Sequence, residues 1–206
     1  MKVRNIGTGP LMVNTYLAYD EDTKKGFIVD PGGYSKDLEL FIAKENIEIE
    51  YIILTHGHGD HIGGVFEHLN DHSNAKVVAS VDEVPMLVDP NSNMTTQTHG
   101  RAISIKPDIE VWDGETMMVG NMELKFIMTP GHSPGGMCIL VDKVLFCGDT
   151  LFRDSIGRTD FQGGSFKELK ESIHSKLFVL DPDTQVLPGH MGPTTIGHEK
   201  ENNPFV

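Results

Sequence analysis

The sequence contains few cysteines, no long apolar run and no excess of basic charge, and each absence excludes a class of protein. Only Cys138 and Cys147 are present, and they cannot form the disulfide framework of a small secreted protein, so we expect a reducing, cytoplasmic location. No run approaches the roughly 18 apolar residues of a membrane-spanning helix. The formal net charge is −13 and no basic stripe is present, so we expect neither a nucleic acid nor a membrane as a partner.

The remaining composition is typical of one globular domain. Hydrophobic residues make up 38% of the 206 positions and charged residues 23%, and no low-complexity segment or linker is visible. The weakest candidate boundary is the polar stretch from Asp89 to Gly100, which we interpret as a long loop. We therefore predict a single domain over residues 1–206.

Short apolar runs separated by turn residues dominate the chain. We predict strands over Val13–Tyr19, Phe27–Val29, Tyr51–Leu54, Val77–Ala79, Thr116–Val119, Leu124–Met128, Cys138–Val141, Val144–Cys147 and Gln185–Leu187. We predict helices after the N-cap Ser35, over Ile62–Leu69 and over Ser165–Leu177. The order is roughly β-α-β-α, then many strands, then α-β. This order predicts an α+β fold in which helices cover two β-sheets packed face to face.

Residues 55–61 read Thr-His-Gly-His-Gly-Asp-His and directly follow the apolar run Tyr51–Leu54. Two glycines interrupt this segment, so we expect a tight turn rather than a helix face, with neighbouring side chains pointing inward together. Imidazole and carboxylate groups are ligands that zinc, iron and manganese accept. The segment therefore predicts a metal site that includes His56, His58, Asp60 and His61.

Three further candidate ligands each follow a glycine at the end of an apolar run. They are His132 after Pro130-Gly131, Asp149 after Gly148, and His190 after Pro188-Gly189. A single histidine or aspartate in such a place is more often a capping or hydrogen-bonding residue. The same design repeated at four strand ends instead indicates that these ends meet at one rim of a sandwich, where rigid strands preorganise a metal site.

Seven candidate ligands are too many for one zinc ion, which takes three or four protein ligands. We therefore expect two divalent cations about 3.5–4 Å apart, with zinc as the default and iron or manganese as alternatives. One carboxylate must bridge them, and Asp149 is the natural candidate because its strand lies in the middle of the ligand order. The remaining histidines are expected in solvated or core positions: His68, His72, His99, His174 and His198.

These residues resemble the metallo-β-lactamase superfamily, whose signature Thr-His-x-His-x-Asp-His is followed by separate His, Asp and His ligands. The resemblance covers nearly the whole chain. It implies a four-layer αβ/βα sandwich, with two mixed β-sheets covered by helices and the metals at one edge. It also implies two sets of metal ligands that share Asp149: His56, His58 and His132 for the first metal, and Asp60, His61 and His190 for the second.

Within the superfamily, three stretches are similar to glyoxalase II in its short, single-domain bacterial form: residues 146–152, 155–161 and 188–195. The resemblance implies cleavage of a small-molecule thioester, such as S-D-lactoylglutathione or a related hydroxyacyl thiol, by a hydroxide that bridges the two metals. Asp60 and Asp149 are then the catalytic carboxylates, because both bind metal and Asp60 also orients the hydroxide. Antibiotic-degrading members usually have a cysteine where Asp149 stands, which disfavours that activity.

Two other functions remain open. Persulfide dioxygenases look similar, carry a Gly-Arg-Thr-Asp-Phe stretch as at residues 157–161, and use one iron held here by His56, His132 and Asp149. The ending Pro-Gly-His-Met-Gly-Pro at residues 188–193 fits the hydrolase better. A non-catalytic metal-binding module is disfavoured, because structural zinc sites are usually rich in cysteine and neither cysteine occupies a ligand position.

Arg158 is a candidate substrate-binding residue. It follows Asp149 by nine residues, in a glycine-containing stretch of a strongly acidic chain. Glutathione is anionic, and an arginine can hold a carboxylate through paired hydrogen bonds. The alternative is an ion pair between Arg158 and Asp154 or Asp160, which would give the arginine a structural role.

Overall fold

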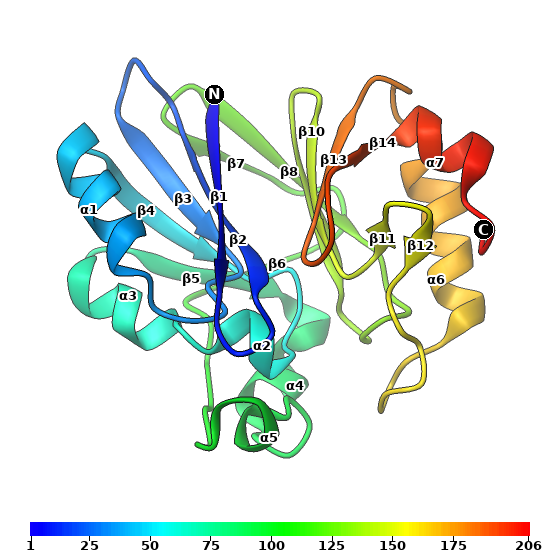
Figure 1. Ribbon diagram of the computed structural model, residues 1–206, viewed down its shortest axis with the longest axis horizontal. Coiled ribbons are helices and arrows are strands. Elements are labelled where there is room, and N and C mark those ends of the chain that lie inside the picture. Colours follow the sequence, from blue (N-terminus) through cyan, green and yellow to red (C-terminus); the bar gives the residue numbers. More distant parts are fainter.

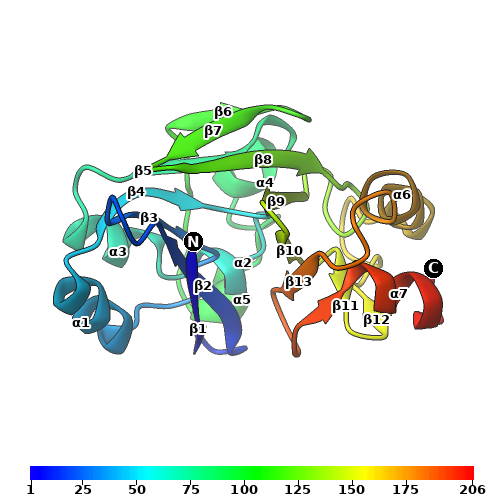
Figure 2. The same cartoon turned by 90° about the horizontal axis from the view of Figure 1, so that it is seen from above.

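The computed structural model describes residues 1–206 and contains two six-stranded β-sheets that pack face to face, with helices on both outer faces (Figure 1). Figure 2 shows the same layers from above, with the N-terminal part of the chain on one side and the C-terminal part on the other. No helix combines the length and the apolar character needed to cross a bilayer. The predicted α+β sandwich of two sheets covered by helices is confirmed.

The first sheet comes from the N-terminal half, and its strands are neighbours in sequence order. They are β1 (Lys2–Thr8), β2 (Val13–Tyr19), β3 (Lys25–Val29), β4 (Glu48–Ile53), β5 (Lys76–Ser80) and β6 (Ile109–Val111). β1, β2 and β3 are antiparallel neighbours, whereas β3, β4, β5 and β6 run parallel. Because β3 and β4 are parallel, they end at the same edge, and Asp30 lies beside the segment that begins at Thr55.

The second sheet comes from the C-terminal half and has the order β14-β13-β10-β9-β8-β7. Its strands are β7 (Thr116–Val119), β8 (Met122–Met128), β9 (Met137–Val141), β10 (Val144–Gly148), β13 (Gln185–Pro188) and β14 (Thr194–Thr195). β10 and β13 run parallel, and the other neighbouring pairs are antiparallel. A small hairpin of β11 (Leu151–Phe152) and β12 (Ser155–Ile156) follows β10. Both sheets are therefore mixed.

The main core lies between the two sheets. It is a cluster of 17 buried residues that includes Phe27 and Ile53 from the first sheet and Phe126, Ile139 and Phe146 from the second. The rings of Phe27 and Phe146 meet edge to face with centroids 5.9 Å apart, which joins β3 to β10. Because successive residues of a strand point to opposite faces, the same strands also supply the outer faces that the helices cover.

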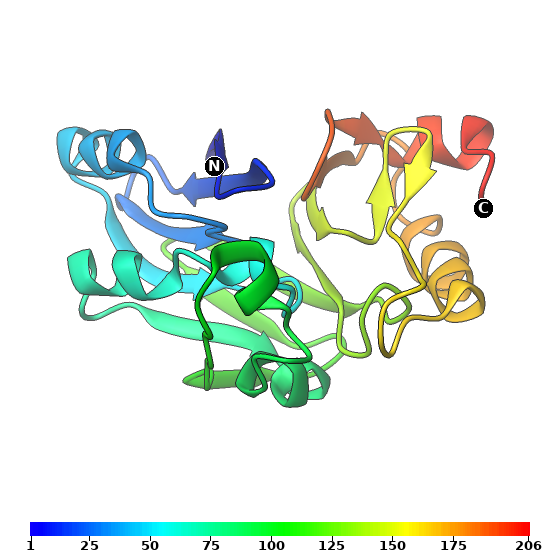
Figure 3. The same ribbon diagram turned by 60° about the horizontal axis from the view of Figure 1, so that its bottom comes forward.

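Helices cover both outer faces. On the first sheet lie α1 (Lys36–Glu45) and α3 (Val65–Asp71), and on the second lie α6 (Phe166–Ser172) and α7 (Ile196–Asn202). α1 begins at the predicted N-cap Ser35, whose hydroxyl accepts a hydrogen bond from the Leu38 backbone N–H. The short helices α2 (Gly59–Ile62), α4 (Val84–Val88) and α5 (Thr95–His99) lie at the end that is lowest in Figure 1 and comes forward in Figure 3.

The predicted helix Ile62–Leu69 is wrong as one element. α2 ends before Gly63 and Gly64, and α3 begins after them. A Cβ on Gly64 would lie 2.5 Å from the carbonyl carbon of Gly33. This close approach of two backbones explains both the glycine and the break in the helix.

Three other boundaries also differ from the prediction. Residues 55–61 are a turn only in their first half, since α2 begins at Gly59 and contains Asp60 and His61. The long loop predicted for residues 89–100 contains α5. The helix predicted to reach Leu177 is α-helical only to Ser172 and then forms a single π-helical turn. Helix ends fray, and local propensity defines them poorly, so differences of this kind are expected.

A cluster of two histidines and one carboxylate joins α1 to α3. Glu39 on α1 accepts hydrogen bonds from His68 Nδ1 and, at 2.8 Å, from His72 Nε2. Burial raises the pKa of Glu39, but these two hydrogen bonds outweigh burial and hold the pKa at about 2. The folded pKa is below the ordinary value of 4.5, so Glu39 stabilises the fold at neutral pH, and this contribution declines as the pH falls from 4.5 towards 2.

We expect Glu39→Gln to lower the free energy of unfolding by about 3 kcal/mol at pH 7 and by roughly half of that or less at pH 3. Urea unfolding of the variant and of the unchanged protein at both pH values measures the difference. An equal loss at both pH values would show that the charge of Glu39 does not stabilise the contact between the two helices.

Candidate metal centre

Four strand ends meet at one edge of the sandwich and bring the seven predicted ligands together. β4 leads to residues 56–61, β8 to His132, β10 to Asp149 and β13 to His190. Six of the side chains form two groups, in each of which the ligand atoms lie within 4.8 Å of one another. The groups are His56, His58 and His132, called the first group below, and Asp60, His61 and His190, called the second group.

Asp149 lies between the two groups. Its Oδ1 is 3.4 Å from His61 Nε2 of the second group, and its Oδ2 is 3.6 Å from His132 Nε2 of the first group. Its Oδ2 is also 3.9 Å from His190 Nε2. A carboxylate whose oxygens lie close to histidines of both groups has the position that a bridge between two cations requires.

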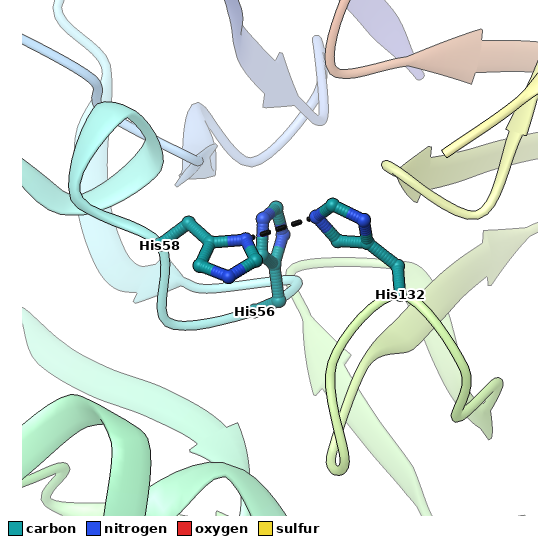
Figure 4. Close-up of side chains that lie close together, drawn as sticks. All are labelled: His56, His58 and His132. Carbon is teal, nitrogen blue, oxygen red and sulfur yellow. Dashed lines mark hydrogen bonds between the residues drawn. The ribbon is translucent and has the colours of Figure 1, made fainter. Parts of the chain in front are cut away.

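The three histidines of the first group turn their rings towards one another (Figure 4). His58 Nδ1 and His132 Nε2 are 2.9 Å apart. The His56 ring lies edge-on to both, with its centroid 4.9 Å from that of His58 and 4.7 Å from that of His132. Three imidazoles gathered in this way provide the number and kind of protein ligands that catalytic zinc sites use.

Hydrogen bonds to the outer ring nitrogens orient one histidine of each group. In the second group, His61 Nδ1 lies 2.9 Å from Asp30 Oδ2. In the first group, His132 Nδ1 donates to the backbone oxygen of Arg158 at 2.6 Å. With the proton on Nδ1, each of these rings presents the lone pair of Nε2 to the centre.

Asp30 also fixes the start of the ligand segment. Its carboxylate accepts hydrogen bonds from the Thr55 backbone N–H at 2.8 Å and from the Thr55 hydroxyl at 2.6 Å. The Thr55 hydroxyl in turn lies 3.1 Å from His56 Nδ1. One buried carboxylate therefore orients both groups. Asp30 was not predicted from the sequence: it follows a buried strand, as the ligands do, but no glycine precedes it and no other ligand-type residue lies beside it.

The glycines that precede the ligands are required by close contacts. Gly148 has a positive φ of 48°, and a Cβ there would lie 2.1 Å from the Thr55 hydroxyl oxygen. A Cβ on Gly189 would lie 2.5 Å from Asp149 Oδ1. These strands can end next to the ligand segment only because glycine stands at both positions.

The centre contains buried polar atoms that no protein group satisfies. His56 Nε2, His61 Nε2 and Asp149 Oδ1 are buried and lack a hydrogen-bond partner. Unsatisfied atoms of this kind are rare in folded proteins and are expected where an ion or water binds. All three belong to the predicted ligand set, so the residues present fit the divalent cations that the sequence predicts.

Burial and neighbouring charges prepare the site for cations. Burial lowers the pKa of His58 to about 4, with a further contribution from His132, so the ring is neutral at pH 7 as a ligand must be. Burial also lowers the pKa of His61, but the carboxylates of Asp149 and Asp60 outweigh burial and raise that pKa well above its usual value. A position that stabilises a proton in this way also favours a metal cation, which meets the same carboxylates.

A cavity of about 390 Å³ opens onto the centre, and its walls are largely apolar. Its apolar lining comes from Leu11, Met94, Phe152, Phe161 and Met191. The polar lining includes ligands of both groups and Asp149, so a molecule in the cavity meets both groups at once. These wall residues were not predicted from the sequence, because only the tertiary fold brings their separate segments together.

Arg158 lines the same cavity but is paired with a neighbouring carboxylate. Its Nε and Nη2 donate to the two oxygens of Asp160 at 2.9 and 2.7 Å, and its guanidinium lies 4.2 Å from the centroid of the Phe161 ring. The ion pair that was considered as an alternative to substrate binding by Arg158 is therefore present, and its partner is Asp160. Both side chains are about two-thirds exposed, and such an exposed ion pair contributes little to stability, so an anionic substrate can replace Asp160.

The remaining histidines lie outside the centre. His68 and His72 bind Glu39, as described above, and His99 Nε2 lies 2.8 Å from the Gly32 backbone oxygen. His198 is paired with Asp154 on the surface, and His174 packs edge-on against Phe178. No cluster of possible metal ligands that contains one of the seven predicted ligands also contains one of these five histidines.

The fold and the centre together define a class of protein. The sequence model of the metallo-β-lactamase superfamily matches residues 8–190, so the chain belongs to this superfamily. Its members are metallo-hydrolases and related proteins that bind divalent metals, which agrees with the two groups of histidine and aspartate described above.

Among similar proteins, hydroxyacylglutathione hydrolase GloC of Haemophilus influenzae is 32% identical over 216 residues, covering 100% of this chain and 98% of that protein. The crystal structure of the BLEG-1 B3 metallo-β-lactamase is 38% identical, with a TM-score of 0.91 and coverage of 99% of both chains. That of ETHE1 from Myxococcus xanthus is 30% identical, with a TM-score of 0.80 and coverage of 99% of this chain and 84% of that chain.

The crystal structure of TTHA1623 in a di-iron-bound form is also 30% identical, with a TM-score of 0.85 and coverage of 98% of this chain and 100% of that chain. Similar identity to a glutathione thioester hydrolase and to a β-lactamase establishes the family and the fold. The substrate must therefore be argued from the centre and its cavity.

Proposed function

We propose that the protein is a two-metal hydrolase of small-molecule thioesters, with S-D-lactoylglutathione or a related hydroxyacyl thiol as substrate. The first group would hold one divalent cation and the second group another, and Asp149 would be a ligand of both. The observation that carries the proposal is the position of this carboxylate, which lies between the two groups and close to histidines of both. Zinc is the default metal, with iron or manganese as alternatives, and the similar TTHA1623 structure contains two irons.

Two divalent cations at this centre supply an activated water molecule and stabilise negative charge on a carbonyl oxygen. Asp60 lines the cavity, and its Oδ2 is held 3.1 Å from His190 Nε2. In the proposed reaction Asp60 accepts a hydrogen bond from the attacking water and orients it towards the thioester carbon. Asp149 holds the two halves of the centre at a fixed separation.

The lining of the cavity favours a thioester over an amide. Its titratable side chains are proposed metal ligands and Arg158, so no free acid is available to protonate a leaving group. A thiolate leaves without protonation because the pKa of the thiol is about 8.5, whereas an amine leaving group needs a proton. The GloC relative, whose name is that of a glutathione thioester hydrolase, supports the same choice.

A persulfide dioxygenase with one iron is the second candidate, and the similarity to ETHE1 fits either function. An iron held only by His56, His132 and Asp149 would leave the buried Nε2 of His61 without a partner. A second cation, bound by the second group, would give that nitrogen a partner. This difference favours the hydrolase.

The proposed function is tested by a panel of four substrates with one purified, metal-loaded preparation. The panel contains S-D-lactoylglutathione, a thioester of an uncharged thiol, glutathione persulfide with an oxygen electrode, and a chromogenic cephalosporin. We expect release of thiol from the thioesters without consumption of oxygen, and slow or no cleavage of the cephalosporin. Oxygen consumption with glutathione persulfide, or cephalosporin cleavage faster than thioester cleavage, would overturn the proposal.

Substrate recognition by Arg158 predicts a loss that depends on the charge of the thiol. We expect Arg158→Ala to lower kcat/KM for S-D-lactoylglutathione roughly 10–150-fold, since one charge-assisted contact is worth about 1.5–3 kcal/mol. Because this contact is remote from the carbonyl, most of the loss should be an increase in KM. A thioester of an uncharged thiol should be cleaved at an almost unchanged rate.

Asp160→Asn is the matched control for this prediction. It removes the partner of Arg158 but keeps the guanidinium, so KM for the glutathione thioester should stay the same or fall. If Arg158→Ala lost kcat/KM equally on the charged and the uncharged thioester, the arginine would stabilise the loop rather than bind the substrate.

A further inference from the structure

A buried carboxylate outside the ligand set, that of Glu83, connects the two loops that carry the first group. Glu83 is only 1% exposed and follows β5, at the end of a short 3-10 turn. Its Oε1 accepts a hydrogen bond from the backbone N–H of Gly57 at 2.7 Å. Its Oε2 accepts hydrogen bonds from the backbone N–H of Gly135 at 2.7 Å and from the hydroxyl of Ser133 at 3.0 Å.

The donors to Glu83 lie directly beside the ligands of the first group. Gly57 stands between His56 and His58, and Ser133 follows His132. The carboxylate therefore has one oxygen on the loop that carries two ligands and the other oxygen on the loop that carries the third. No comparable contact links Glu83 to the second group, whose His61 is oriented by Asp30.

The surroundings of Glu83 leave little room for the loops to move. A Cβ on Gly135 would lie 2.2 Å from the backbone nitrogen of Glu83, and a Cβ on Gly57 would lie 3.0 Å from Met86 Cγ and 3.2 Å from Glu83 Oε1. Both loops thus pack directly on residues 83–86. No lysine, arginine or histidine forms an ion pair with Glu83, so the three hydrogen bonds to the loops offset only part of the cost of burying its carboxylate.

We propose that Glu83 is a positioning residue that sets the separation between the His56–His58 loop and the His132 loop, and thereby the affinity of the first group for its metal. The inference rests on the proposed two-metal centre. Partners in the shell around metal ligands orient those ligands, and their loss typically lowers metal affinity about 10–100-fold. Because Glu83 contacts only the loops of the first group, the loss should be confined to that group.

Glu83→Gln tests the proposal because it keeps the shape of the side chain and changes its hydrogen-bonding pattern. An amide has one acceptor oxygen and one donor NH2 group. Its NH2 must therefore face either the Gly57 N–H or the Ser133 and Gly135 donors, so one of the two loops loses its anchor. Ser133→Ala removes a single donor and should cause a smaller loss of the same kind, and Asp82→Asn, at the exposed neighbour of Glu83, is the control.

The two metal positions are separated by measuring Glu83→Gln in two backgrounds. His190→Ala weakens the second group and leaves the first intact, and His58→Ala does the reverse. Zn²⁺ affinity is measured by competition with a chromophoric chelator on metal-depleted protein, together with the Tm of the metal-free forms. We expect Glu83→Gln to lower Zn²⁺ affinity about 10–100-fold in the His190→Ala background and to leave it unchanged in the His58→Ala background.

Unchanged affinity in the His190→Ala background, or equal losses in both backgrounds, would overturn the positioning role of Glu83, whatever the change in Tm. If Glu83→Gln does not fold, the same comparison with Ser133→Ala decides the matter. A parent protein that binds fewer than two Zn²⁺ ions would instead contradict the proposed function itself, so the two failures are distinguishable.

Discussion

Asp149→Ala is expected to lower kcat/KM for a thioester roughly 10²- to 10³-fold and to reduce the metal content of the protein. The carboxylate lies between His61 and His132, at 3.4 and 3.6 Å, and its removal leaves no group to join the two halves of the centre. Removing one preorganised electrostatic group from an active site typically costs about 2.7–4 kcal/mol, and each 1.36 kcal/mol corresponds to a factor of about ten in rate. Steady-state kinetics and elemental analysis of the same preparation measure both effects.

Cys147→Ser is the matched control for Asp149→Ala. Cys147 is fully buried on β10, two residues before Asp149, and its Sγ lies 3.1 Å from the Leu151 backbone oxygen. A hydroxyl can make the same contact, so metal content and kcat/KM should change little. If Cys147→Ser lost its metal while Asp149→Ala kept it, the proposed ligand set would be wrong.

Removal of the metals with a chelator is expected to abolish hydrolysis and to lower Tm by roughly 8–16 °C. A ligand present at 1,000 times its Kd stabilises a fold by about 4 kcal/mol, and 1 kcal/mol shifts Tm by about 2–4 °C in a protein of this size. Without cations, the carboxylates of Asp30, Asp60 and Asp149 share one buried centre in which histidines are the neighbouring groups able to carry positive charge.

Differential scanning fluorimetry before and after chelation, followed by addition of Zn²⁺, measures the effect on stability. Recovery of both Tm and activity on adding the metal is the expected result. A Tm that does not change once the protein has been shown to be metal-free would contradict a metal centre that is part of the fold.

The strands were largely predictable because a buried sheet needs continuous apolar runs. Tyr51–Leu54, for example, overlaps the end of β4, and Val13–Tyr19 coincides with β2. β1 is absent from the predicted strands because its residues Lys2–Thr8 form an edge strand that is mostly exposed and carries no apolar alternation. Its pairing with β2 is a tertiary effect that a local pattern does not reveal.

The ligands were predictable because four of them lie within six residues and each of the other three follows a glycine at the end of an apolar run. Glu83 and Asp30 were not, because a single acidic residue after a strand has no distinctive spacing. Leu11 and Met191 come from distant parts of the chain. A hydrogen bond of 2.9 Å from Asn14 Nδ2 to the Met191 backbone oxygen ties the two segments together, and only the folded chain shows it.

Elemental analysis of protein purified without added metal, with thioester hydrolysis measured on the same preparation, tests the central claim most directly. Two complete groups of ligands that share Asp149 predict two metal ions per chain and release of thiol from S-D-lactoylglutathione or a related thioester. One iron per chain and no second metal, together with oxygen consumption on glutathione persulfide, would contradict it.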